Sequence, residues 1–188
     1  MIFTETGLPG AWLLDLEPIA DARGFFARTF DAREFEKRGM RPLVAQCNLS
    51  YNHAKGTLRG MHMQIPPATE PKLVRCTRGA IYDVIVDMRP DSPTYLRHYG
   101  AELTADNRRQ LYVPDMFAHG YLTLTDGAEV AYQVGEFYSP GFERGLRHDD
   151  PALGIVWPAP VAVLSDKDAA WPLLGAAERA APGAGAAA

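Results

Sequence analysis

The stretch LRGMHMQ, residues 58–64, places one histidine between two methionines and three residues after an arginine. Imidazole is the only side chain whose unperturbed pKa lies near neutral pH, which makes His62 a candidate general base. A lone histidine on an apolar strand is more often structural, but His62 has polar residues near it in the sequence, namely Arg59, Gln64 and Lys72. On a regular strand Arg59 and His62 lie on opposite faces, and a bend at Gly60 would change that.

Short strands must position these residues, because most of the chain has strand character. Residues 80–88, AIYDVIVDM, alternate with period two and predict a strand with one core face. Residues 121–124 and 129–134 flank Asp126 and Gly127, a pair typical of a hairpin turn. A short helix is expected from Asp31 as N-cap to Gly39. The pattern lacks the alternating helices of a parallel sheet and therefore predicts an all-β antiparallel sandwich or barrel.

Bulk composition narrows the class of protein. The chain has 188 residues, of which 47% are hydrophobic and 22% charged, as in an ordinary globular domain. A net charge of -4 with interspersed signs gives no basic patch for nucleic acid, and no apolar run is long enough to span a membrane. We expect a cytoplasmic protein with one domain over residues 1–174 and a flexible Ala/Gly-rich tail over residues 175–188. Cys47 and Cys76 are expected to stay reduced.

The spacing of Gly60, His62 and His119 resembles the two motifs of the cupin superfamily, whose usual first motif carries His-x-His as metal ligands. Gly60 and Gln64 flank His62 at those positions, so one expected nitrogen ligand is absent. His62, Glu70 and His119 are a conceivable metal set. Glu70 lies in the loop PPATEP, where a solvated carboxylate is the simpler interpretation, and we therefore predict a barrel without a metal.

A more specific resemblance rests on eight separated motifs in order: DARGFFARTF, QCNLS, GTLRGMHMQ, KLVRCTRGAIYDVIVDMR, LYVPDMFAHGYLTL, AYQVGEFYSP, LRHDDPALGIVWP and LSDKD. Together they resemble the dTDP-4-dehydrorhamnose 3,5-epimerase family, and the similarity runs from about residue 1 to Leu174. The resemblance implies a cupin-type antiparallel jelly-roll barrel with a few short helices. It also implies epimerisation at the carbons flanking the ketone of a nucleotide-linked 4-keto-6-deoxyhexose, without a metal or organic cofactor.

The resemblance assigns roles to four catalytic residues. His62 matches the family base, and Asp150 matches its carboxylate partner, with Asp149 the less favoured choice. Lys72 matches the lysine that supports the oxyanion, and Tyr132 matches the acid on the opposite face of the sugar. A tyrosine between Val130 and Val134 is equally what a β-core would contain, so the family match decides that assignment.

Further family positions imply contacts with the substrate and a second chain. Arg23 and Arg59 resemble diphosphate ligands, and Tyr138 matches an aromatic residue that stacks on the base. The remaining matches to substrate-contact positions are Gln46, Asn48, His119, Glu143 and Lys167. The family also implies a homodimer in which the N-terminal segment crosses to the partner and brings Arg23 to the other chain's site.

Three departures from the family pattern leave alternatives open. Arg28 stands at a frequently acidic position near the nucleotide-binding end, Met63 replaces a common aromatic residue, and His148 replaces a frequent tryptophan. A substrate that carries a nucleotide other than the thymidine nucleotide is therefore an alternative. Inversion at C3 alone and a ketoisomerase share the same enolate chemistry. A further alternative belongs to another functional class: a jelly-roll module that binds sugar nucleotides without converting them.

Overall fold

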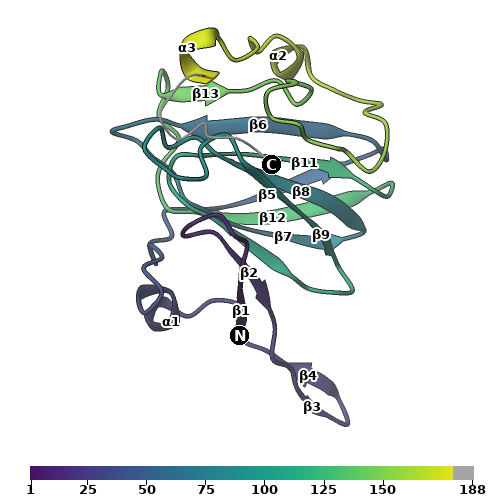
Figure 1. Cartoon of the computed structure of the whole chain (residues 1–188). Coiled ribbons are helices and arrows are strands. Elements are labelled where there is room, and N and C mark those ends of the chain that lie inside the picture. Colours follow the sequence, from purple (N-terminus) through teal and green to yellow (C-terminus); the bar gives the residue numbers. More distant parts are fainter. Residues whose placement is uncertain (180–188) are drawn as a thin grey trace.

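Two antiparallel sheets packed face to face make up most of the computed structural model, which describes residues 1–179 (Figure 1). The six-stranded sheet has the order β1 (Ile2–Glu5), β2 (Trp12–Asp15), β10 (Gln110–Val113), β7 (Lys72–Arg78), β12 (Ala128–Val134) and β5 (Gln46–Asn52). The five-stranded sheet has the order β13 (Glu143–Gly145), β6 (Leu58–Gln64), β11 (Phe117–Thr123), β8 (Ala80–Asp87) and β9 (His98–Thr104). The predicted mainly β fold, an antiparallel jelly-roll barrel with a few short helices, is confirmed.

The main core lies between the two sheets, where Val74 and Val130 of the six-stranded sheet meet Ile81 and Ile85 of β8. The alternation predicted for β8 is correct, but both of its faces are buried. Val84 and its neighbours on the second face pack beneath the C-terminal segment through Leu146, Leu153 and Leu174. Covering of the second face by that segment explains why β8 has no solvent-facing side.

The predicted hairpin around Asp126 and Gly127 is wrong. Strand β11 pairs with β6 and β8, whereas β12 pairs with β5 and β7 in the other sheet. The turn is real, and Gly127 has a φ of 63°, which favours glycine. The chain uses it to cross between the sheets, a choice that depends on tertiary pairing and not on the turn residues.

The described helices are short. Asp31 caps α1 (Ala32–Glu36) by accepting hydrogen bonds from the N–H groups of Arg33 and Glu34, so the predicted helix start is confirmed. The C-terminal segment carries α2 (Asp166–Ala169) and α3 (Ala176–Arg179). No helix within residues 1–179 is long and apolar enough to cross a membrane. Helix α3 lies in the predicted tail, whose residues 180–188 fall outside the described part, so the flexibility of the tail stays a prediction.

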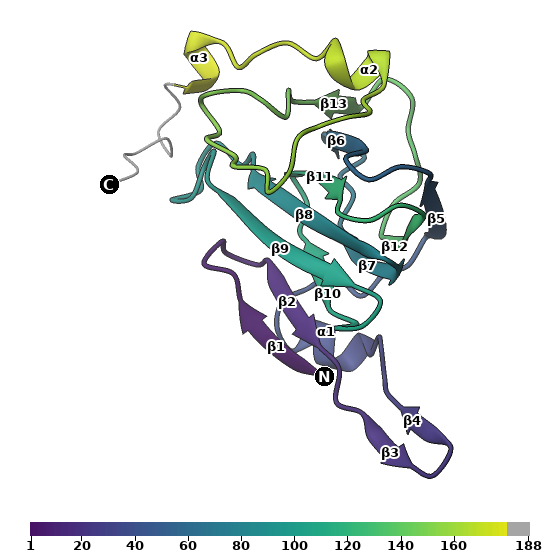
Figure 2. The same cartoon turned by 90° about the vertical axis from the view of Figure 1, so that its right-hand side faces the viewer.

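A two-stranded hairpin projects from the body of the molecule at the end opposite α2 and α3 (Figure 2). Its strands are β3 (Ile19–Asp21) and β4 (Gly24–Phe26). Ile19 is 71% exposed and Phe26 is 64% exposed. Large apolar side chains at such exposure mark a surface that gains stability when it is covered.

Candidate active site

A cavity between the sheets collects nearly all of the predicted site residues. Two adjoining hollows, of about 340 and 380 Å³, share His62, Lys72 and Tyr132 in their walls. The other predicted residues that line one hollow or the other are Gln46, Asn48, Arg59, His119, Tyr138, Glu143 and Lys167. Arg23 and Asp150 line neither hollow.

An irregularity between β6 and β11 turns Arg59 and His62 to the same cavity. The register pairs Tyr121 with Arg59 and His119 with His62, so three steps along β6 oppose two along β11. Gly60 has a φ of 138°, and a Cβ built on it would lie 2.5 Å from the Cα of Gly120. The predicted bend at Gly60 therefore exists, and it depends on two backbones too close for any side chain.

The carboxylate partner of His62 is Asp168. Its Oδ1 lies 2.6 Å from Nε2 of His62, and its Oδ2 accepts a hydrogen bond of 3.3 Å from the N–H of Gly60. Asp168 stands in α2, where the hydroxyl of the N-cap Ser165 accepts from the Asp168 N–H. The Asp168 side chain is only 6% exposed, whereas that of His62 is 34% exposed. A buried carboxylate thus holds one ring nitrogen and leaves the imidazole accessible from the cavity.

The prediction that Asp150 pairs with His62 is wrong, as is the alternative of Asp149. Asp150 is buried, and its two oxygens accept hydrogen bonds from the backbone N–H groups of Ala152, at 2.8 Å, and Leu174, at 2.6 Å. Asp149 forms an exposed pair with Arg147. An aspartate before a proline readily shapes a turn, and that is what Asp150 does here.

A second histidine–carboxylate pair lies beside the first. Nε2 of His119 lies 2.8 Å from Oδ1 of Asp83, and both side chains are largely buried. Because His119 is directly opposite His62 in the register, the two rings line neighbouring parts of one wall. Asp83 fixes the orientation of the His119 ring, as carboxylates do for histidines in binding sites.

Lys72 and Tyr132 come from the other sheet. The Lys72 ammonium lies 2.5 Å from a Glu70 oxygen, and both side chains are mostly buried. Burial raises the pKa of the Tyr132 phenol above its ordinary value; the neighbouring Tyr121 and Glu70 add to the rise and Arg59 opposes it. A phenol is already protonated across the neutral range at its ordinary pKa, and a raised pKa leaves it in that state, which is the state of a proton donor.

Polar and aromatic groups surround the rest of the cavity. Both oxygens of Glu143 lie within 2.7 Å of the Lys167 ammonium, and this contact raises the pKa of Lys167. Arg59 donates to the Asn52 side chain at 2.8 Å, which leaves its guanidinium along the wall. Tyr138 is 59% exposed. An arginine, a lysine and an exposed aromatic ring are suited to a charged ligand with a planar base.

Arg23 is not part of this chain's cavity. It lies in the turn of the projecting hairpin, its side chain is 90% exposed, and its contacts are with Asp21. A role for Arg23 in substrate binding therefore requires a cavity other than the one in its own chain.

The conceivable metal set is not assembled. His62, Glu70 and His119 each face a different partner, namely Asp168, Lys72 and Asp83. Among residues 1–179, no group of three or more His, Cys, Asp or Glu side chains is arranged to hold a metal ion. That the reaction needs neither a metal nor a cofactor stays a prediction.

Sequence reasoning missed two carboxylates of the cavity. Asp168 follows Ser165 by three residues, a spacing typical of a capped helix start, and it adjoins the predicted Lys167. This capping pattern is the feature of the sequence that could have pointed to Asp168 as a site residue. Glu70 carried no comparable signal, and the interpretation of it as a solvated carboxylate is wrong, because its side chain is 12% exposed and lines the cavity.

Comparisons with known proteins agree with this geometry. The family model of dTDP-4-dehydrorhamnose 3,5-epimerase matches residues 5–176. The dTDP-4-dehydrorhamnose 3,5-epimerase of Sinorhizobium fredii (strain NBRC 101917 / NGR234) is 42% identical over 175 residues, which cover 93% of this chain and 90% of that protein.

Two solved structures are similar over most of their length. The crystal structure of dTDP-4-dehydrorhamnose 3,5-epimerase from Bacillus anthracis str. Ames with TDP and PPi bound has a TM-score of 0.87 and 43% identity, and the match covers 92% of this chain and 99% of that one. ChmJ, a 3'-monoepimerase from Streptomyces bikiniensis in complex with dTDP-quinovose, has a TM-score of 0.82 and 35% identity, with 92% and 88% covered. The cavity, the fold and these similarities lead to one conclusion: the chain belongs to the dTDP-4-dehydrorhamnose 3,5-epimerase family.

Proposed function

We propose that this enzyme inverts C3 and C5 of dTDP-4-dehydro-6-deoxyglucose through an enolate, giving the dTDP-4-dehydrorhamnose configuration. One observation carries the proposal: the His62–Asp168 pair on one side of the cavity faces Tyr132 and Lys72 from the other sheet. Inversion needs a base on one face of a carbon and an acid on the other, and a cavity walled by two sheets supplies both.

His62 acts as the base in this proposal. Because Nε2 is bonded to Asp168, the lone pair of Nδ1 takes the proton from the carbon beside the ketone. The electrons of the broken C–H bond move to the ketone oxygen and form the enolate. Asp168 stabilises the imidazolium that results, and Gly60 N–H and Ser165 keep α2 in place against β6.

Lys72 and Tyr132 complete the reaction. The Lys72 ammonium stabilises the negative charge on the enolate oxygen, a contribution of about 3–4 kcal/mol for such a group in a preorganised site. Tyr132 returns a proton to the opposite face of the carbon, and its phenol carries that proton across the neutral range. His62 then holds one proton more and Tyr132 one fewer, and exchange with solvent resets both.

The remaining cavity residues hold the nucleotide. Arg59 and Lys167 offer positive charge to the diphosphate, and Tyr138 offers an exposed ring to the base. Gln46, Asn48, His119 and Glu143 supply further polar contacts along the same walls. Arg28 lies outside both hollows of its own chain, 3.7 Å from Asp31, and exchange assays with dTDP, UDP and GDP sugars measure the nucleobase preference.

The decisive experiment is NMR of deuterium incorporation after incubating the protein in heavy water with dTDP-4-keto-6-deoxyglucose. We expect exchange at both C3 and C5, and we expect His62→Ala to reduce the rate by at least roughly 10²-fold, as loss of a positioned base does. Undiminished turnover in His62→Ala would overturn the assignment of the base.

The similarity to a 3'-monoepimerase makes inversion at C3 alone the second candidate. The same spectra separate the two, since exchange restricted to C3 would favour it. A ketoisomerase would move the carbonyl and change the carbon spectrum. Absence of exchange with dTDP, UDP and GDP sugars, together with a rise in melting temperature on their addition, would favour a binding module.

The proposal includes a homodimer and a cytoplasmic location. The exposed apolar side chains Ile19 and Phe26 on the projecting hairpin, and the distance of Arg23 from its own cavity, support a second copy of the chain as the partner. Sedimentation equilibrium would measure the mass of the assembly, and cell fractionation would test the location.

A further inference from the structure

The loop between β6 and β7 brings a carboxylate into the cavity. Glu70 precedes Lys72 by two residues, and its side chain is 12% exposed. It lines the same hollow as His62 and Tyr132. A charged group of this kind, buried beside a reaction site, needs a reason beyond solubility.

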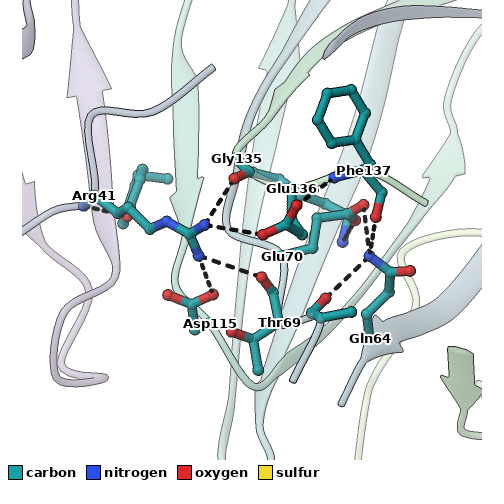
Figure 3. A network of polar contacts seen from close by, with 11 residues as sticks. Arg41, Gln64, Thr69, Glu70, Asp115, Gly135, Glu136 and Phe137 are labelled. Atoms are coloured by element: carbon teal, nitrogen blue, oxygen red, sulfur yellow. Dashed lines mark hydrogen bonds and ion pairs between the residues drawn. The ribbon is translucent and has the colours of Figure 1, made fainter. Parts of the chain in front are cut away.

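One hydrogen bond from Gln64 reaches the Glu70 carboxylate, and the other bonds of Gln64 hold the backbone around it (Figure 3). The Gln64 amide donates to Oε2 of Glu70 at 3.3 Å and to the carbonyl oxygens of Ala68 and Phe137, each at 3.1 Å. Its own oxygen accepts from the Ser139 N–H at 2.7 Å. Gln64 therefore connects β6, the loop before β7 and the segment after β12 at the position of Glu70.

Arg41 holds the neighbouring backbone (Figure 3). Its guanidinium donates to the carbonyl oxygens of Thr69, at 3.4 Å, and Gly135, at 3.0 Å, and it pairs with Asp115 and Glu136. Thr69 immediately precedes Glu70. The residue before Glu70 and the segment after β12 are thus held by one planar cation, which restricts where the carboxylate can move.

The other Glu70 oxygen lies 2.5 Å from the Lys72 ammonium, whose side chain is 9% exposed. Removing two charges from water often offsets their attraction, so fold stability alone is a weak reason for such a pair. An ammonium has three N–H donors. Glu70 takes one of them in a fixed direction and leaves two for the cavity.

We propose that Glu70 is a positioning residue of the epimerase, which acts through Lys72 by holding its ammonium where the ketone oxygen of the sugar must lie. The inference rests on the proposed function, because it assigns Lys72 to the oxyanion. Glu70 restricts the flexible lysine side chain to one orientation before substrate binds. Its charge also adds to the raised pKa of Tyr132, which stands on the neighbouring strand of the same sheet.

The first test is a double-mutant cycle of Glu70→Gln and Lys72→Met on the rate of deuterium exchange. Glu136→Gln is the matched control, because it removes a carboxylate from the same Arg41 network without touching Lys72. We expect Glu70→Gln to lower kcat by roughly 10-fold to 100-fold with little change in KM, as misplacement of a catalytic group does. In the Lys72→Met background the same change should have no further effect. Glu136→Gln should leave kcat as in the wild type.

The second test needs no turnover. The chain has four lysines, at positions 37, 55, 72 and 167, so NMR of 15N-labelled lysine ammonium groups can follow Lys72 in the free protein, with Lys72→Met identifying its signal. We expect the signal to move or broaden in Glu70→Gln and to stay in place in Glu136→Gln. An unchanged Lys72 signal, or an equal loss of kcat from Glu70→Gln with and without Lys72, would overturn the inference. The two proposals can fail separately. If the wild-type protein exchanges no substrate protons but the Lys72 signal still depends on Glu70, the proposed function is refuted and the Glu70–Lys72 pair is established.

Discussion

The imidazole of His62 depends on a carboxylate that lies 106 residues later in the chain. Both oxygens of Asp168 are used, one by the ring and the other by the N–H of Gly60. The aspartate therefore fixes the ring relative to the strand that carries it. A group that orients a base in this way contributes to the rate without contacting the substrate.

Asp168→Asn should lower kcat by roughly 10²-fold to 10⁴-fold, because an amide of the same shape no longer stabilises the imidazolium. Steady-state kinetics and urea unfolding of the same preparations separate this effect from a loss of stability. We expect KM and the unfolding midpoint to change little.

Asp150→Asn is the matched control, since it changes the aspartate that sequence reasoning favoured. Its amide would place an N–H against the backbone N–H of Ala152 or Leu174. We expect a loss of about 1–3 kcal/mol in the free energy of unfolding with a nearly normal kcat. A larger fall in kcat for Asp150→Asn than for Asp168→Asn would contradict the assignment.

The contrast between Asp150 and Asp168 shows which parts of the site could be predicted from the sequence. The family resemblance predicted the histidine, the lysine and the tyrosine of the cavity, because each stands inside a motif that the resemblance covers. The partner aspartate belongs to a short helix in an irregular segment, and only the three-dimensional path of residues 146–174 decides which carboxylate reaches the ring. Spacing along the chain carries no information about that path.

Strands β6 and β11 approach so closely at Gly60 and Gly120 that neither position has room for a Cβ. The approach accompanies the register shift that turns Arg59 and His62 to one cavity. Sequence reasoning anticipated a bend at Gly60 but could not place Gly120 against it, because strand pairing between the two is a long-range property. For the same reason the turn at Gly127 was predicted to close a hairpin, whereas the chain uses it to cross between the sheets.

Gly60→Ala should therefore reduce both stability and activity. The backbone conformation alone costs an alanine about 1–3 kcal/mol, and the contact with Gly120 should add a similar amount. Urea unfolding measures the loss of stability. The rate of deuterium exchange measures the loss of activity that follows if His62 and Arg59 no longer share the cavity.

Gly7→Ala separates the two costs, because Gly7 has a φ of 81° but nothing within 4 Å of an added Cβ, and it lies outside the hairpin that carries Arg23. It should lose stability by the backbone cost only and keep its kcat. Equal losses in the two variants would mean that the β6–β11 approach has no special role.

The whole molecule divides the proposed chemistry between two sheets and leaves one predicted ligand, Arg23, in the turn of the β3–β4 hairpin. That hairpin projects from the body of the molecule at the end opposite α2 and α3 (Figure 2). An antiparallel sandwich or barrel was predictable from the many short strands, and the jelly roll was predictable from the family resemblance. The destination of the hairpin was not, because no pattern in its sequence distinguishes a surface of the same chain from that of a partner.

If Arg23 serves the cavity of a second copy, two inactive variants should complement each other. A mixture of Arg23→Ala and His62→Ala, unfolded and refolded together, should regain activity above that of either variant, because a mixed dimer contains one complete site. Exchange assays on the mixture and on each variant refolded alone provide the measurement. No recovery, with mixed dimers verified by mass spectrometry, would place Arg23 outside the partner's site.

The position of Asp168 late in the chain also has a consequence for biosynthesis. At a synthesis rate of about 5–20 residues per second, the 106 residues between His62 and its partner take on the order of 5–20 seconds to make. Every strand of both sheets is translated before the aspartate. The strands that carry His62, Lys72 and Tyr132 are therefore synthesised before the aspartate that supplies the counter-charge of the base.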